Sequence, residues 1–577
     1  MISVHPTEAY PAVQTLIQAK AASRVHAKDA TLYDFSEQAF QCAENFMGWT
    51  DLAENPPCPP KAVKKLARRF IDAGMKTAVL IGQGGSTQAS MVLTKYFKDE
   101  KPAMDFIILD SDSPVRLREA MARCKPSKTV VVVSSKSGGT LEMRLMLSAV
   151  RALFLESMNE QQLAEHLVAI TDPGSPLAQR ALEEGWAGIL YGEPAVGGRF
   201  SALSVFGLFP AALVGMPLKK MMKRAARAER LCSADSPENP AIQLAAFLYG
   251  NYSAGCRELA FVSPKRGRAL GLWIEQLLAE STGKQGRGVL PYLEVDPLLL
   301  AQNRADRMVV VYRMPGGSRD AREGFERAVA CINPDIPRLD FEVRDAQDLA
   351  AHFVMWEYAT AFLGYLMQVC PFDQPDVASA KACVSEILET GLPAPDLAGP
   401  LAGDLPIGPA RVRLSECCAG APSAYGALKA LLGSLKPGDY FAVNAFLPFA
   451  GDDRKRALEA IRFAVADKRG VPACLEVGPR FLHSTGQLQK GGPNNGVFLV
   501  LSADEPDDIP LVDQPAASLG ALAEAQATGD AQVLASRGRR VLHLHLPDNY
   551  GITLGLLAAL VREVLDDLDK EAPLGRA

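Results

Sequence analysis

The feature that most constrains the fold is a regular alternation of short apolar runs and helical patterns, which starts near residue 61. Runs of four to eight apolar residues between helices are typical of strands buried on both faces, as in a parallel sheet. We therefore expect an α/β protein with two parallel-sheet sandwich domains and an additional, smaller C-terminal α/β domain. The expected strands are 77–81, 106–109, 129–133, 167–170, 259–262, 308–312, 411–414, 440–447, 473–477, 497–501 and 541–546.

Punctuation by proline and changes in pattern predict the domain limits. Prolines at 56, 57, 59 and 60 end an N-terminal arm, since proline does not continue a helix. The predicted organisation is an arm over 1–57, a first domain over 58–225, a second over 226–395 and a third over 400–577.

Composition excludes several classes of protein. The net charge is −5 over 577 residues, so neither nucleic acid nor an anionic membrane is expected as a partner. The 11 cysteines are odd in number and without CxxC spacing, which favours reduced thiols. No apolar stretch is long enough for a bilayer and the N-terminus does not read as a secretory signal, so a cytoplasmic location is expected.

A glycine loop over 82–87 joins an apolar strand to a helix pattern. Glycines let the backbone approach an anion, and the following helix offers free N–H groups. Gly85 and Ser86 are therefore candidate phosphate ligands. A tight strand-to-helix turn is the structural alternative. A dinucleotide site is another, because Asp110 ends the next strand, but Thr87 stands where its third glycine is expected.

A second loop, SSKSGGT at 134–140, also lies between a strand and a helix. Hydroxyls, a lysine and two glycines at a helix N-terminus suit a dianion. The carboxyl ends of parallel strands meet at one edge of a sheet, so the two loops are expected to share one crevice. A sugar phosphate uses such a pair of loops, whereas a dinucleotide does not. The candidate ligands here are Ser135, Lys136, Ser137 and Thr140.

Five motifs in order resemble the glucose-6-phosphate isomerase family, of the sugar-isomerase (SIS) superfamily. They are IGQGGS at 81–86, SSKSGGT at 134–140, VGGRFS at 196–201, QLLAESTGK at 276–284 and CPFDQPDVASAK at 370–381. The segments LKPGDYFAVNAFLP and GPRFLHSTGQLQKGGPN further resemble the isomerase half of bacterial transaldolase–isomerase fusions.

The resemblance implies reversible conversion of glucose 6-phosphate and fructose 6-phosphate in glycolysis and gluconeogenesis. It implies no metal and no cofactor. The expected partners are the sugar-phosphate substrate, a second copy of the chain in a homodimer, and possible association with a transaldolase.

The resemblance also gives roles to residues. Glu280 matches the glutamate that moves the proton between C1 and C2, and Arg199 the arginine that stabilises the enediolate. Gly198 and Gln276 match substrate-binding positions. A structural salt bridge remains the alternative for Arg199, and a pairing with Lys284 the alternative for Glu280.

Ring opening of the sugar is the step for which this sequence matches the fewest of the family's residues. Lys381 matches a lysine that contacts the ring oxygen, and Gln374 a substrate-contacting glutamine; a solvated helix lysine is the alternative for Lys381. The family's histidine motif is missing. By order along the chain His352 is the first candidate, although its apolar surroundings also fit a core histidine. His483 resembles part of the motif but comes after Lys381.

Two further functions stay open. The chain could also isomerise mannose 6-phosphate, or it could bind sugar phosphates without catalysis. The joint presence of Glu280, Arg199 and Lys381 favours an enzyme.

Overall fold

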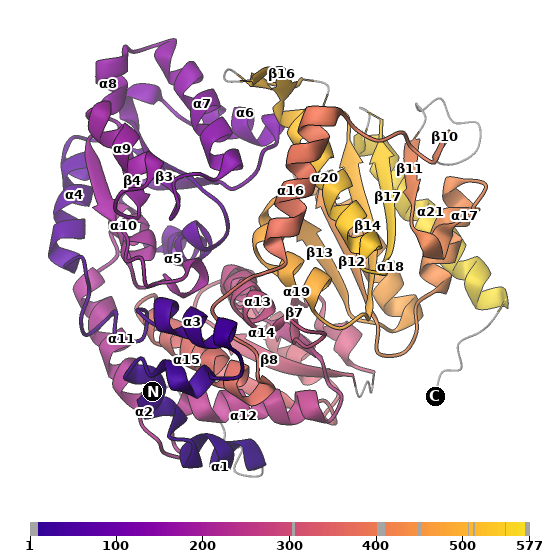
Figure 1. Cartoon of the computed structure of the whole chain (residues 1–577), viewed down its shortest axis with the longest axis horizontal. Helices are drawn as coiled ribbons and strands as arrows, with labels where there is room; N and C mark the ends of the chain where they lie inside the picture. Colours follow the sequence, from indigo (N-terminus) through magenta and orange to yellow (C-terminus); the bar gives the residue numbers. More distant parts are fainter. Residues whose placement is uncertain are drawn as a thin grey trace. The chain divides into compact units, whose positions relative to one another are not determined.

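The computed structural model describes residues 10–302, 306–400, 410–447, 452–505, 507–511, 514–547 and 550–571. Parts of the predicted arm and of the third domain therefore lie outside the described residues. The chain forms two compact units (Figure 1). Unit 1 comprises residues 1–110, 123–374 and 483–488, and unit 2 comprises residues 111–122, 375–482 and 489–577. The three larger sheets fall in three successive stretches of the chain, while the predicted domain limits stay predictions.

The first sheet of unit 1 has five parallel strands in the order β2-β1-β3-β4-β5. Its central strands are runs of valine, isoleucine and leucine buried on both faces, which explains the continuous apolar pattern. The strands are β1 Thr77–Ile81, β2 Asp105–Leu109, β3 Thr129–Ser134, β4 Leu167–Thr171 and β5 Gly188–Tyr191.

The second sheet has four parallel strands in the order β7-β6-β8-β9. Its strands are β6 Glu258–Val262, β7 Leu290–Leu293, β8 Arg307–Arg313 and β9 Arg338–Glu342. Helix α15 (Leu349–Met367) is buried over nearly its whole length and packs against α11, α12 and α13. Each fully buried Leu, Phe or Met side chain contributes about 1.5–3 kcal/mol, so this helix anchors the domain.

Fourteen α-helices lie within the described part of unit 1. They are α1 Pro11–Gln18, α2 Ala21–His26, α3 Glu37–Phe46, α4 Pro60–Asp72, α5 Gln88–Phe97, α7 Leu141–Leu155, α8 Glu160–Ala164, α9 Pro176–Glu183, α10 Val205–Leu213, α11 Leu218–Cys232, α12 Pro240–Ser253, α13 Arg268–Thr282, α14 Arg319–Ala330 and α15. The helices of the arm pack on this core, and Trp49 stacks on Phe200.

Unit 2 contains a six-stranded sheet in the order β10-β11-β17-β14-β12-β13. Strands β17, β14, β12 and β13 run parallel, while β11 is antiparallel to both of its neighbours, β10 and β17. Helices α16 and α20 pack on each other over one face (Figure 1). The strands are β10 Leu397–Gly399, β11 Ala410–Leu414, β12 Tyr440–Phe446, β13 Ala473–Val477, β14 Gly496–Ala503 and β17 Arg540–Leu546, with a separate β15 Pro510–Leu511 and β16 Gln514–Ser518 pair.

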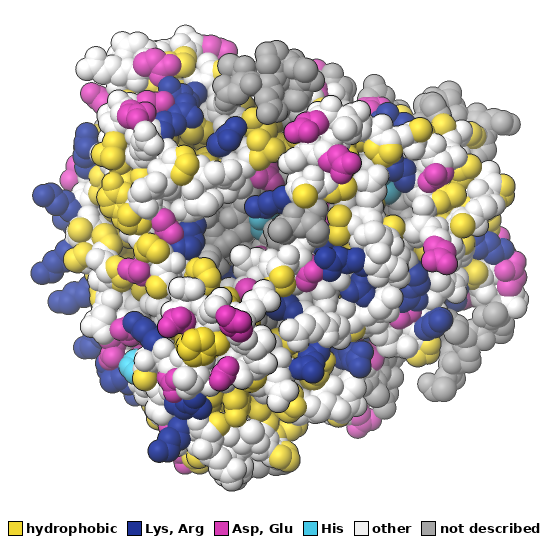
Figure 2. Space-filling model, viewed as in Figure 1, with side chains coloured by type: hydrophobic (Ala, Val, Ile, Leu, Met, Phe, Trp, Pro, Cys, Tyr) yellow, Lys and Arg dark blue, Asp and Glu magenta, His cyan; other side chains and the backbone are white. Residues whose placement is uncertain are grey.

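The helices associated with unit 2 complete the fold. They are α6 Pro114–Ala122, α16 Val377–Thr390, α17 Ala424–Gly433, α18 Asp452–Arg469, α19 Thr485–Gly491, α20 Leu519–Ser536 and α21 Tyr550–Glu571, of which α19 begins in unit 1. Among the described helices, none combines the length and apolarity that a bilayer crossing requires. On the face shown in Figure 2, acidic and basic side chains are interspersed, as the small net charge suggests.

Candidate active site

The glycine loop and the Gly-Gly-Arg loop touch through their backbones. Gly84–Ser86 and Gly198–Phe200 each form a short 3-10 turn. A Cβ added to Gly85 would lie 2.2 Å from the carbonyl carbon of Gly198, and Gly84 has a positive φ of 54°. No side chain fits at Gly85, so glycine there is what brings Arg199 to the end of strand β1.

The serine loop lies beside the glycine loop, as predicted from the neighbouring strands β1 and β3. The hydroxyl of Ser134 donates to the carbonyl of Ser86 at 3.2 Å. The hydroxyls of Ser135 and Thr140 are 3.2 Å apart, and Ser135 accepts a bond from the Gly138 amide at 3.1 Å. This turn leads directly into helix α7, whose N-terminus provides the partial positive charge expected of an anion site.

Lys136 is held at the edge of this crevice. Its ammonium group is paired with Asp172 and donates to the carbonyl of Pro194 at 3.0 Å. Ser137 is exposed and caps the Gly139 amide at 3.3 Å. A pocket joins the two loops, and it is lined by Ser86, Lys136, Glu193, Val196, Gly198, Ser201, Ser204 and Phe206.

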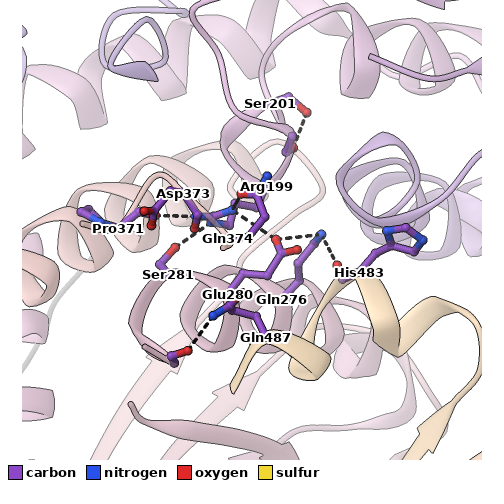
Figure 3. A network of polar contacts seen from close by, with 12 residues as sticks. Arg199, Ser201, Gln276, Glu280, Ser281, Pro371, Asp373, Gln374, His483 and Gln487 are labelled. Atoms are coloured by element: carbon purple, nitrogen blue, oxygen red, sulfur yellow. Dashed lines mark hydrogen bonds and ion pairs between the residues drawn. The ribbon is translucent and has the colours of Figure 1, made fainter. Parts of the chain in front are cut away.

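Arg199 is 4% exposed, and all three nitrogens of its guanidinium group donate hydrogen bonds (Figure 3). Nε donates to the Ser281 hydroxyl at 2.8 Å, and Nη1 to the side-chain oxygen of Gln374 at 2.9 Å. Nη2 donates to the carbonyls of Pro371 and Asp373 at 2.7 and 2.8 Å. The remaining Nη1 contact reaches Glu280 at 3.3 Å. A guanidinium fixed in this way is a positioned charge, because only one geometry satisfies all five contacts.

Glu280 is on the last turn of helix α13, with Gln276 one turn before it. The amide nitrogen of Gln276 lies 3.4 Å from the Glu280 carboxylate, so the two side chains share a face. Burial raises the pKa of Glu280, while Arg199 and then His483 act in the opposite direction. A buried carboxylate with a raised pKa beside a fixed cation has the properties of a general base.

The alternative pairing of Glu280 with Lys284 does not occur. The ammonium group of Lys284 is buried and lies 2.5 Å from Asp373, and it also donates to the carbonyl of Cys370. Lys284 therefore holds the segment 370–374, whose carbonyls hold Arg199. The sequence analysis missed this support, although Lys284 and Asp373 both lie inside the motifs it used.

His483 is the histidine that the structure brings to this group. His483 belongs to unit 1, although in sequence it lies between strands β13 and β14 of unit 2. Its carbonyl accepts a bond from Gln276 at 2.7 Å, and its Cβ is 2.8 Å from where a Cβ of Gly84 would be. In Figure 3 the ring points away from Glu280. Its Nε2 lies 3.6 Å from the carboxylate of Glu142, in the first turn of α7.

His352 is placed elsewhere, in the first turn of the buried helix α15. Its Nδ1 is 3.2 Å from the Tyr312 hydroxyl, and its ring packs edge-on against Tyr312 and Phe341. Burial lowers its pKa to about 4. These are the surroundings of a neutral core histidine, which was the alternative interpretation of the sequence. Glu142 was missed, although a carboxylate two residues after the serine loop is a signal that could have found it.

The last two predicted residues differ in their surroundings. Gln374 contacts Arg199 and thus belongs to the group around Glu280. Lys381 is an exposed residue of α16, in unit 2, so its predicted role stays a prediction.

The sequence of this chain is similar to those of known sugar-phosphate isomerases. Residues 70–288 match the family model described as phosphoglucose isomerase. The chain is 27% identical over 388 residues to a glucose-6-phosphate isomerase of Mycoplasmopsis pulmonis, covering 60% of this chain and 90% of the relative. It is 35% identical over 218 residues to one of Cyanothece sp., covering 37% of this chain and 41% of that relative.

Two solved structures share the fold. A hypothetical protein from Thermus thermophilus aligns with a TM-score of 0.57 at 24% identity, over 67% of this chain and all of the other. A glucose-6-phosphate isomerase from Chlamydia trachomatis aligns with a TM-score of 0.51 at 19% identity, over 58% and 74%. These comparisons confirm the predicted fold class and the resemblance to the glucose-6-phosphate isomerase family, while the narrower resemblance to transaldolase–isomerase fusions stays a prediction.

Proposed function

We propose that this chain interconverts glucose 6-phosphate and fructose 6-phosphate. The premise is that the chain belongs to the phosphoglucose isomerase family and is a sugar-phosphate isomerase. The observation that carries the proposal is the buried contact of Arg199 with Glu280, next to two loops suited to a phosphate. Neither a dinucleotide site nor a simple phosphate sensor needs a buried base paired with a fixed cation.

In this proposal the hydroxyls and amides of the two loops bind the phosphate, which fixes the sugar at one end. The ligands are Gly85, Ser86, Ser135, Lys136, Ser137 and Thr140. Because the Lys136 ammonium is paired with Asp172, its part is to donate N–H groups at the edge of the crevice rather than to supply an uncompensated positive charge. Backbone and hydroxyl donors at a helix N-terminus supply most of the binding.

Glu280 acts as the base in the isomerisation. It removes a proton from the carbon next to the carbonyl and returns it to the neighbouring carbon, through an enediol. Burial raises the pKa of Glu280 and so strengthens it as a base, while Arg199 acts on that pKa in the opposite direction and stabilises the charge that develops on the enediolate. Gln276 positions the carboxylate.

Ring opening is assigned to His483 rather than His352, with Lys381 as a further candidate. The backbone carbonyl and Cβ of His483 contact Gln276 and Gly84, which places the residue at the site, and its ring nitrogen lies 3.6 Å from the carboxylate of Glu142; both observations support this choice. The homodimer, the cytoplasmic location, the association with a transaldolase and activity on mannose 6-phosphate remain predictions.

Replacement of Glu280 by glutamine tests the proposal. Glu280→Gln keeps the shape of the side chain and removes the base, so turnover of fructose 6-phosphate should fall by at least about 100-fold. Glu275→Gln, on another face of α13, is the matched control, and circular dichroism verifies that both variants fold. Wild-type protein that binds sugar phosphate without turnover would instead identify a sensor.

A further inference from the structure

Two buried cysteines meet beside the segment that holds Arg199. Cys42 is on helix α3 of the arm and Cys370 follows helix α15; they are 9% and 5% exposed. Their sulfur atoms lie within 4.8 Å of each other. We propose that Cys42 and Cys370 form a reversible disulfide when a peroxide or a small-molecule disulfide oxidises the protein, and that this bond lowers the turnover of the isomerase.

The two thiols have unequal reactivity. A hydrogen bond from Cys42 to the Cys370 sulfur lowers the pKa of Cys370, and the nearby Lys284 ammonium acts in the same direction. The same bond raises the pKa of Cys42. The thiolate is the nucleophile in thiol chemistry, so Cys370 reacts first and Cys42 resolves.

The reaction with hydrogen peroxide balances as follows. The Cys370 thiolate attacks one peroxide oxygen, the O–O bond breaks, and the leaving hydroxide takes up a proton to become water. Cys370 is then a sulfenic acid. The Cys42 sulfur attacks that sulfur, the S–S bond forms, and the hydroxyl leaves with the Cys42 proton as a second water. Two thiols lose two electrons in total, and one peroxide is reduced to two waters.

The bond would act on the site through the backbone of residues 370–374. A disulfide needs its sulfurs about 2.05 Å apart, so Cys370 is drawn towards α3. The next carbonyls, of Pro371 and Asp373, accept the two Nη2 bonds of Arg199, and the carbonyl of Cys370 itself accepts from Lys284. A misplacement of about 1 Å at a catalytic group costs on the order of 100-fold in rate.

A metal ion is the competing occupant of this cluster, because Asp373 completes a group of three possible ligands. The Lys284 ammonium lies 2.5 Å from the Asp373 carboxylate. A divalent cation would have to displace this charge or lie against it, so the structure favours the disulfide.

The test uses the full-length reduced protein, treated with hydrogen peroxide and then assayed for thiols, cross-linked peptides and activity. We expect the thiol count after denaturation to fall from the 11 of the sequence by two. Non-reducing peptide mass mapping should join the Cys42 and Cys370 peptides. Turnover should fall at least about tenfold and recover with dithiothreitol.

Variants separate this pair from the other close pair, Cys417 and Cys418, whose sulfurs are 3.4 Å apart. Cys42→Ser, or Cys42→Ala if the first does not fold, should keep its activity in peroxide, whereas Cys417→Ser should respond like the wild type. An unchanged Cys42 peptide, equal inactivation of the Cys42 variants, or zinc bound to the purified protein would overturn the proposal. Only the loss of activity rests on the proposed function; the peptide map tests the disulfide without it.

Discussion

Two histidines that the sequence left in competition have different neighbours. His352 packs against aromatic rings, while His483 contacts Gln276 and lies near Glu142. We therefore expect His483→Asn to lower kcat for fructose 6-phosphate by about 10²-fold, within the range of a lost proton-transfer group. His352→Asn should keep kcat within a few fold once its folding is verified. Steady-state kinetics of both variants measure this difference. A larger loss of kcat in His352→Asn than in His483→Asn would assign ring opening to His352.

His352 should instead affect how the stability of the protein depends on pH. Its folded pKa is about 4, below the 6.5 of an unfolded histidine, so between these values the unfolded chain binds the extra proton. The free energy of unfolding should therefore decrease by about 3 kcal/mol from this group as pH falls from 6.5 to 4.

Urea unfolding of the wild type and of His352→Gln at pH 7 and pH 4.5 measures this contribution. The wild type should lose more stability than the variant over this range. Equal losses would show that the imidazole is not buried in the neutral form.

At the scale of elements, glycines decide how closely loops approach. Gly85→Ala would force the Gly198 backbone to move by about an ångström, which is enough to misplace Arg199. Turnover should fall on the order of 100-fold. Gly139→Ala is the matched control, because its added Cβ would meet nothing nearer than 4.0 Å. Steady-state kinetics measure the turnover of the two variants, and thermal unfolding verifies that both fold. Equal turnover would show that the close contact between Gly85 and Gly198 is not needed for catalysis.

Strands were predicted well where both neighbours are strands. The predicted runs 77–81 and 129–133 match central strands, whereas in unit 1 the strands β5, β7 and β9 were missed. All three are edge strands. Their sequences contain Gly188 in β5, Pro291 in β7 and alternating charges in β9, since a strand with one open side does not need a continuous apolar run.

At the scale of the whole molecule, the segment His483–Leu488 belongs to unit 1 although the chain before and after it belongs to unit 2. The Gln487 side chain donates to the Gly283 carbonyl at 2.9 Å, and a Cβ on Gly283 would lie 2.4 Å from the Cα of Leu488. This segment thus contributes to the packing around Gly283, which directly follows the helix that carries Glu280.

A chain ending near residue 395 should therefore lack activity, even if its two sheets fold, because it lacks this segment. The comparison needs turnover and circular dichroism of the truncated and full-length proteins. Activity of the truncated chain within about tenfold of the full chain would show that the segment, including His483, is dispensable.

The sequence by itself determined the α/β class and the two phosphate-type loops, because a strand, a turn and a helix N-terminus are adjacent in the chain. The roles proposed for Glu280 and Arg199 come from the resemblance to a known family. Only the tertiary structure decided which histidine and which carboxylate accompany them. Those choices depend on contacts between residues more than 200 positions apart, such as Gln276 with His483, and no local pattern encodes such a contact.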